Sequence, residues 1–190
     1  MKVVQNINNF TSKEKTFVTI GTFDGVDYGH QKIIEKLVIE AKEAGKKSVL
    51  LTFFPHPRMV LQKDASLELI NTIEERAFLL EKTGLDYLII HPFSKAFSRT
   101  TALEFVRNIL VNQLNISKLI IGYDHHFGKN REGNITQLTE YSHIYDFTVE
   151  EIPAQDIDDV SVSSTKIRRA LASGNLKTAN DFLGYFFMIN

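Results

Sequence analysis

Short apolar runs alternate with longer amphipathic segments along most of this 190-residue chain, and this alternation limits the possible folds more than any other feature. The runs are rich in Val, Ile, Leu and Phe without a regular polar alternation, which is typical of strands buried on both faces. We expect strands at Thr16–Gly21, Ser48–Phe54, Tyr87–His91, Lys118–Tyr123 and Phe147–Pro153.

The segments between these runs have the spacing of helices. In Gly29–Ala44 the apolar side chains recur three or four residues apart and form one stripe, and Gly45 lies where such a helix would end. Similar stripes predict helices over Ile73–Thr83 and Thr101–Leu114. The alternation predicts an α/β fold, a mostly parallel sheet with helices on both faces. In such folds the ligand binds beyond the carboxyl ends of the strands.

Charge and composition exclude several classes of protein. The 22 Lys and Arg residues balance 23 Asp and Glu residues, for a net charge of -1, which argues against general affinity for nucleic acid or anionic membrane. The absence of cysteine excludes disulfides, thiolate catalysis and zinc–sulfur sites. Met1–Phe10 lacks the apolar stretch of a secretion signal, and no apolar run is long enough to span a bilayer. We therefore expect a soluble cytoplasmic protein, and composition sets no oligomeric state.

The first expected strand leads through a glycine-containing loop directly into a helix. The loop and the start of the helix read Gly21, Thr22, Phe23, Asp24, Gly25, Val26, Asp27, Tyr28, Gly29 and His30. Glycines let a backbone approach a ligand closely, and the free amides at a helix start attract phosphate. His30, in the first helical turn, could donate to a phosphate oxygen. The same residues are also compatible with an ordinary strand-to-helix turn.

Prolines and an aromatic neighbourhood follow the second expected strand. Pro55 and Pro57 fix an extended backbone on either side of His56 and remove two hydrogen-bond donors. Rigid prolines beside aromatic rings suit a flat ligand. A merely structural turn fits these residues equally well.

The loop after the fourth expected strand, Gly122–Asn134, is dense in Gly, Asp, His and Arg and is poor material for a core. Its adjacent histidines, His125 and His126, raise the question of a metal. Neighbouring side chains diverge on an extended backbone, however, and no second ligand pair stands at a suitable spacing. An ordered binding loop is the better interpretation.

A hydroxyl-rich segment precedes the last expected helix, which Gly174 ends. Ser163, Ser164 and Thr165 stand at the helix start and Arg168 lies one turn further in. Together they would offer amides, hydroxyls and a forked cation to a polyphosphate. The alternative is a serine N-cap followed by exposed cations.

The four segments occur together and in order, and in this the chain resembles the FMN adenylyltransferase module of bacterial bifunctional riboflavin kinase/FMN adenylyltransferases, the FAD synthetases. The matching stretches are Ile20–Leu37, Thr52–Leu61, Pro92–Leu110, Ile121–Asn134 and Val162–Leu183. The resemblance implies a Rossmann-like nucleotidyltransferase fold. It also implies transfer of the adenylyl group of ATP to FMN with Mg²⁺, giving FAD and pyrophosphate, by in-line attack and without a covalent enzyme intermediate.

The resemblance also implies roles for individual residues. The ATP-binding set is Gly21, Thr22, Phe23, Asp24, Gly25, Gly29, His30, Ser163, Ser164, Thr165 and Arg168. The catalytic set is His30, Asp27, Ser164 and Arg168. The flavin-binding set is Pro55, His56, Pro57, Asp124 and Phe127. It assigns no metal ligand.

One residue departs from the family pattern, which has a histidine three residues before His30, facing the ATP phosphates, where this chain has Asp27. A unit-charge contact at about 4 Å and an effective dielectric near 20 is worth roughly 4 kcal/mol. If the carboxylate opposes the transition state by that amount, the rate falls about a thousandfold. A carboxylate is also a good magnesium ligand, which would reverse the sign. We expect impairment.

The resemblance divides the chain into an FMN adenylyltransferase domain, residues 1–186, and the start of a linker, residues 187–190. Bifunctional members continue into a riboflavin kinase domain, which we do not expect within a sequence that stops at Asn190, and a truncated piece and a stand-alone enzyme are equally consistent with this. Two alternatives remain. A nucleotidyltransferase for another phosphorylated acceptor, such as a pantetheine or nicotinamide nucleotide, would not explain Pro55–Pro57 together with Gly122–Gly133. A catalytically weakened module that binds ATP or flavin would explain Asp27.

Overall fold

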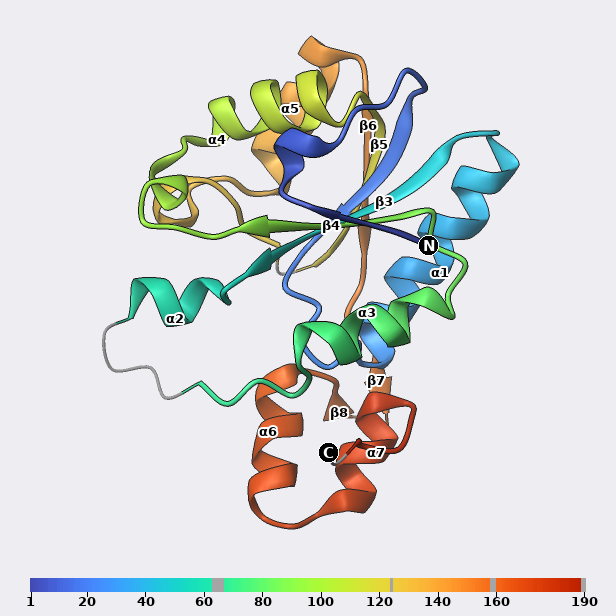
Figure 1. The fold of residues 1–190 in the computed structure, drawn as a ribbon, viewed down its shortest axis with the longest axis vertical. Helices are drawn as coiled ribbons and strands as arrows, with labels where there is room; N and C mark the ends of the chain where they lie inside the picture. Colours follow the sequence, from blue (N-terminus) through green and yellow to red (C-terminus); the bar gives the residue numbers. More distant parts are fainter. Residues whose placement is uncertain (63–66, 124, 158–159, 189–190) are drawn as a thin grey trace.

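The protein is described by a computed structural model over residues 1–62, 67–123, 125–157 and 160–188. Within these residues one six-stranded sheet, all parallel, has the order β1-β4-β3-β2-β5-β6 (Figure 1). The strands are β1 (Lys2–Gln5), β2 (Thr16–Ile20), β3 (Lys47–Phe54), β4 (Tyr87–Pro92), β5 (Ile116–Gly122) and β6 (Thr148–Ile152). The helices are α1 (Tyr28–Glu43), α2 (Pro57–Leu61), α3 (Ile73–Glu81), α4 (Ala102–Glu104), α5 (Ile135–Tyr145), α6 (Ser164–Ala172) and α7 (Leu176–Leu183).

All five expected strands are present as β2 to β6, each within two residues of its expected bounds. The predicted α/β fold with a parallel sheet is confirmed. Strand β1 was not expected, because its four residues are too few to show a pattern. It pairs with β4 and forms the outer edge of the sheet.

The strand order places β2 at the centre of the sheet. From β2 the chain proceeds through β3 and β4 in one direction, then returns to β5 and β6 on the other side of β2. The direction of winding therefore reverses between β2 and β5. In open parallel sheets that reversal opens a crevice at the carboxyl ends of the strands, where ligands bind.

Helices cover both faces of the sheet, as expected. Helices α1 and α3 pack on one face over a buried cluster that includes Ile34, Leu37 and Leu80, while α4 and α5 lie on the other (Figure 1). In α1, the buried residues Ile34, Leu37 and Ala41 belong to the stripe that predicted the helix. Gly45 has φ 62°, which confirms it as the residue that ends the helix.

The expected helix over Thr101–Leu114 forms with a different geometry. One α-helical turn, α4, is followed by a π-helix over Phe105–Gln113, and the amide of Leu114 still bonds to the carbonyl of Ile109. A π-helix is wider than an α-helix, so the same apolar residues cover the sheet with a changed side-chain angle. Spacing alone does not distinguish the two.

A small C-terminal unit sits below the sheet in Figure 1. Helices α6 and α7 pack against each other and bury Ile70, Ile167, Phe182 and Leu183 in a cluster of their own. A two-stranded antiparallel ribbon, Asp156–Ile157 with Val160–Ser161, precedes α6. No helix in the described part of the chain is long and apolar enough to cross a membrane.

Candidate functional site

The loop between β2 and α1 turns at the carboxyl end of the central strand. Phe23, Gly25 and Val26 have left-handed backbones, with φ values of 48°, 95° and 42°. Side chains rarely tolerate this region, so two of these residues are held there against their preference by the surrounding structure. A Cβ on Gly25 would also lie 3.0 Å from Ile70 Cδ1. The loop therefore has one tightly specified shape.

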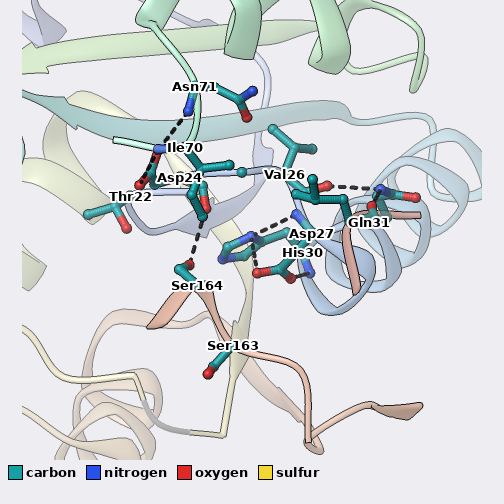
Figure 2. Close-up of polar contacts among 12 residues, drawn as sticks. Thr22, Asp24, Val26, Asp27, His30, Gln31, Ile70, Asn71, Ser163 and Ser164 are labelled. Carbon is teal, nitrogen blue, oxygen red and sulfur yellow. Dashed lines mark hydrogen bonds and ion pairs between the residues drawn. The ribbon is translucent and has the colours of Figure 1, made fainter. Parts of the chain in front are cut away.

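Asp27 and His30 form a reciprocal pair of hydrogen bonds that caps the start of α1, as Figure 2 shows. Asp27 is the N-cap: its Oδ1 accepts from the His30 amide at 3.0 Å, and its own amide lies 3.2 Å from His30 Nδ1. Asp27 Oδ2 lies 3.2 Å from the same ring nitrogen. The Asp27 side chain is buried, whereas the His30 side chain is 23% exposed. Nδ1 therefore faces Asp27 and Nε2 is the ring nitrogen turned away from it.

Asp24 is the most heavily engaged carboxylate of the loop. It is 1% exposed, and its oxygens accept from the amides of Ile70 and Asn71 at 3.1 to 3.3 Å. Arg76 Nη2 donates to Oδ1 at 3.2 Å, and Arg168 Nη2 donates to Oδ2. Two arginines from different helices thus meet on one buried carboxylate, which leaves it little capacity to contact a ligand directly.

Arg76 is a site residue that sequence reasoning missed. Its side chain is 1% exposed, and Nη1 donates to the carbonyl of Thr22 at 2.6 Å. Burial lowers the pKa of Arg76, while the Asp24 carboxylate opposes that shift. The signal was present in the sequence: Arg76 interrupts the apolar stripe of α3 between Ile73 and Leu80, where a charge needs a buried partner.

The start of α6 faces the same loop. Ser163 caps the helix by accepting from the Lys166 amide at 3.4 Å, and Ser164 Oγ donates to the Asp24 carbonyl at 3.1 Å (Figure 2). Thr165, in contrast, is exposed. Arg168 Nε also donates to the carbonyl of Glu68 at 2.8 Å, so part of this guanidinium already bonds the protein. Ser164 and Arg168 of the predicted ATP-binding set are therefore brought to Asp24, whereas, within the described residues, no hydrogen bond to Asp24 is made by Ser163 or Thr165.

His56 caps a third helix at this edge of the sheet. Its Nδ1 accepts from the Arg58 amide at 3.1 Å at the start of α2, and the residue is 9% exposed. Burial lowers the pKa of His56 to about 4; the Asp24 charge opposes the shift and the Arg168 charge adds to it. His56 is thus a neutral acceptor within electrostatic reach of the Asp24 pair. Pro55 precedes it, and Pro57 is the first residue of α2.

Phe127 lies in the core. It is 7% exposed, packs on Phe105 with ring centroids 5.6 Å apart, and exchanges backbone hydrogen bonds with Gly133. A Cβ on Gly133 would lie 2.5 Å from the Phe127 ring. The ring therefore closes the loop by packing inside it. Asp124, the other predicted flavin residue of this loop, lies outside the described residues.

Sequence reasoning also assigned no role to a cluster of half-buried rings beyond β3 and β4. Phe97 lies 5.5 Å from Phe53, 5.7 Å from Phe93 and 4.6 Å from His91, measured between ring centroids. Two of these rings belong to Pro92–Arg99, a stretch that carried the family resemblance. The planes of these rings are inclined to one another by 45° to 71°, and the cluster offers ring faces and edges next to the predicted proline segment.

Comparison with known proteins gives consistent results. Residues 9–166 match the sequence profile of the FAD synthetase family. Bifunctional riboflavin kinase/FMN adenylyltransferases are 34% identical in Buchnera aphidicola subsp. Schizaphis graminum and 31% identical in Escherichia coli strain K12, each over 100% of this chain. The chain spans 62% and 61% of the length of these two relatives.

A solved structure has the same fold over nearly the whole chain. It is titled a macrolide-efflux protein from Streptococcus pneumoniae, with a TM-score of 0.86 and 27% identity. The match covers 96% of this chain and 60% of that one. The likeness extends the agreement from sequence to the arrangement of the whole sheet and its helices.

Proposed function

Because the chain belongs to the FAD synthetase family, we propose that it transfers the adenylyl group of ATP to FMN, releasing FAD and pyrophosphate. The observation that carries the proposal is the meeting of two helix starts, α1 and α6, on the loop at the central strand. Backbone amides at helix starts bind phosphate, and here two of them flank the crevice where such sheets bind nucleotides.

The chemistry asks little of the protein beyond position and charge. A phosphate oxygen of FMN attacks the α-phosphorus of ATP in line, the new P–O bond forms as the bond to the β-phosphate oxygen breaks, and pyrophosphate leaves with those electrons. Such transfers are accelerated by alignment and by stabilising charge on the phosphoryl oxygens. His30 Nε2 and the amides that open α6 are the groups of this chain suited to that work.

Arg168 and Asp24 have a different role in this scheme. Their ion pair attaches α6 to the β2–α1 loop, with Arg76 as the second cation on the same carboxylate. We assign Asp24 and Arg76 to positioning the loop. Arg168 can still direct charge at a phosphate from this position, because its side chain is 19% exposed.

Asp27 is compatible with activity in this geometry. Its carboxylate is turned into the start of α1, where it accepts from the His30 amide. This hydrogen bond supports a weaker repulsion than that of an unpaired carboxylate facing a phosphate, and impairment by Asp27 stays a prediction. The remaining negative charge still weakens the anion site at α1, because it opposes the helix dipole's attraction for phosphate.

Magnesium enters this scheme with ATP. The described residues contain no group of three or more His, Cys, Asp or Glu side chains placed to hold a metal ion. Mg²⁺ commonly keeps several waters and binds through substrate phosphates with one or two carboxylates, so it needs no dedicated cluster of protein ligands. We therefore treat the magnesium complex of ATP as the substrate.

The half-buried rings beyond β3 and β4 fit the second substrate. An isoalloxazine ring is flat and largely apolar, and the Phe53, Phe93 and Phe97 cluster supplies aromatic ring faces and edges beside Pro55 against which it could pack. His56, neutral and capping α2, lies between Pro55 and Pro57 and is influenced by the charges of Asp24 and Arg168. A nucleotidyltransferase for a non-aromatic acceptor would have no use for such a surface.

The experiment is chromatographic detection of FAD from FMN, ATP and Mg²⁺, with this protein and its Asp27→His variant in parallel. FAD from both supports the proposal and shows that the carboxylate is tolerated. FAD from the variant alone identifies a weakened member of the family. If neither folded protein makes FAD, the acceptor is not FMN, and phosphopantetheine and nicotinamide mononucleotide are the next substrates to assay.

A further inference from the structure

The C-terminal end of α7 and the residues just after it also contact the β2–α1 loop and the first turn of α1. Gln31 Nε2 donates to the carbonyl of Val26 at 2.8 Å and to the carbonyl of Leu183 at 2.7 Å. Tyr185 Oη donates to the carbonyl of Gly25 at 2.5 Å. Two successive loop carbonyls are therefore bonded by side chains connected to the end of α7. Tyr185 lies just after this helix, and Gln31 also bonds its last residue, Leu183.

These two carbonyls need such partners. Gly25 and Val26 have left-handed backbones, so neither belongs to a helix or a strand that would supply regular hydrogen bonds. Buried carbonyls without partners are strongly disfavoured. The donors supplied by Gln31 and Tyr185 therefore stabilise a loop shape that the backbone alone would not favour.

The hydrogen bond to the Val26 carbonyl also sets the direction of the Asp27 amide, which belongs to the same peptide group. In a trans peptide the C=O and N–H groups point in opposite directions. With the Val26 carbonyl bonded to Gln31, the Asp27 amide points the other way, to His30 Nδ1 at 3.2 Å. That contact turns His30 Nε2 away from Asp27 (Figure 2). The orientation of the His30 ring is thus linked to the end of α7, more than 150 residues along the chain.

The turn that precedes Tyr185 also has a conformation that favours glycine. Gly184 ends α7 with φ 74°, and a Cβ there would lie 3.4 Å from Gln31 Nε2. On the far side of the Tyr185 hydroxyl lies Asn71, with Oδ1 at 3.0 Å. Burial raises the pKa of Tyr185 to about 12. The hydroxyl therefore keeps its proton, and remains a donor, throughout the working pH range.

We propose that Tyr185 and Gln31 are positioning residues that fix the Gly25–Asp27 backbone, and through it the His30 ring, for the phosphates of ATP. The proposal rests on the function proposed above. A purely structural contact would hold α7 in place without affecting the loop. The two roles predict different changes when one hydroxyl is removed.

The first test needs no substrate. Tyr185→Phe deletes only the hydroxyl, and Gln31→Met removes both amide bonds at similar volume; Tyr145→Phe on α5, at the opposite face, is the control. Hydrogen–deuterium exchange of the free protein is expected to speed up over residues 25–31 in both variants. The increase should be on the order of tenfold in Tyr185→Phe, which loses one hydrogen bond to the loop, and larger in Gln31→Met, which loses two hydrogen bonds. The control should exchange like the unsubstituted protein. Unchanged exchange over 25–31 would overturn the inference.

The second test connects the loop to the substrate. Initial rates with varied ATP and varied FMN should show KM for ATP rising about five- to tenfold in Tyr185→Phe, again one hydrogen bond's worth, with KM for FMN unchanged. Equal changes in both KM values, or a lowered melting temperature alone, would mark a structural role and refute the positioning. If the unsubstituted protein makes no FAD, the proposed function fails, and the exchange result still decides whether the loop is held from α7.

Discussion

The starts of α1 and α6 flank the same loop and yet are capped by different chemistry. At α1 the cap is Asp27, a buried carboxylate whose oxygens face the His30 amide and ring. At α6 the cap is Ser163, a neutral hydroxyl, and the next residue reaches across to the Asp24 carbonyl. Both helix dipoles attract anions, but only α1 already has a negative charge at its end. The difference predicts that α6 is the stronger anion site and that α1 supplies an oriented ring.

Breaking the connection between the two helix starts should have the largest effect. Asp24→Asn keeps acceptor oxygen for the Ile70 amide and leaves Arg76 and Arg168 without their carboxylate. Removing one partner of a buried ion pair typically lowers stability by about 3–5 kcal/mol. Urea unfolding should show a loss of that size. Lys177→Ala, which removes an exposed pair with Asp181, is the control and should change stability by less than about 0.5 kcal/mol.

The third cap, His56, depends on pH, because its ring can accept the Arg58 amide at the start of α2 only while Nδ1 is unprotonated. Its folded pKa, about 4, lies below the unfolded value near 6.5, so between those limits the unfolded chain binds a proton that the folded protein does not. Stability is then fully present above pH 6.5 and falls as the pH drops toward 4, by about 3 kcal/mol. His56→Asn, which retains a capping side chain, should remove this part of the pH dependence in unfolding curves. An identical slope in the variant would contradict the assignment.

Asp27→Asn tests the charge at α1 without removing the cap, because Asn is as good an N-cap as Asp. The lost negative charge should lower KM for ATP about tenfold, equivalent to about 1.4 kcal/mol. Raising the salt concentration should shrink the difference between the two proteins. A higher KM in the variant would mean instead that the carboxylate binds magnesium.

The smallest effect is expected at α6. Ser163→Ala removes the neutral cap, which should lower stability by about 1 kcal/mol in thermal unfolding. The amides that open α6 remain, so affinity for ATP should fall only about threefold. Ser163→Thr, with a hydroxyl in the same place, should restore both values. A loss of ATP affinity far greater than threefold would place the serine oxygen itself on a phosphate.

Much of the fold follows from local pattern, because strands buried on both faces appear as continuous apolar runs. That is why β2 to β6 could be predicted and the four-residue β1 could not. The π-helix escaped for a different reason: apolar spacing in Phe105–Gln113 is compatible with either helix, and the choice depends on packing against the sheet.

The site could be predicted only where its residues are neighbours in the sequence. The loop from Gly21 to His30 and the hydroxyls before α6 could be found because strand, glycine and helix start follow one another. Arg76 and Tyr185 act on that loop from 52 and 160 residues away, and no local pattern connects them to it. The direction of Asp27 was also inaccessible, since a motif position gives a residue's place and not the hydrogen bonds it makes.

The meeting of Arg76 and Arg168 on Asp24 has a consequence for how such a protein can diverge. The three residues come from a loop and two separate helices. Replacing Asp24 alone would leave two arginines without their carboxylate, whereas replacing one arginine leaves Asp24 paired with the other. A neutral residue in place of Asp24 is therefore expected only in combination with a second substitution. Among homologues these positions should vary as a correlated set, and a neutral residue at position 24 should be accompanied by the loss of at least one arginine.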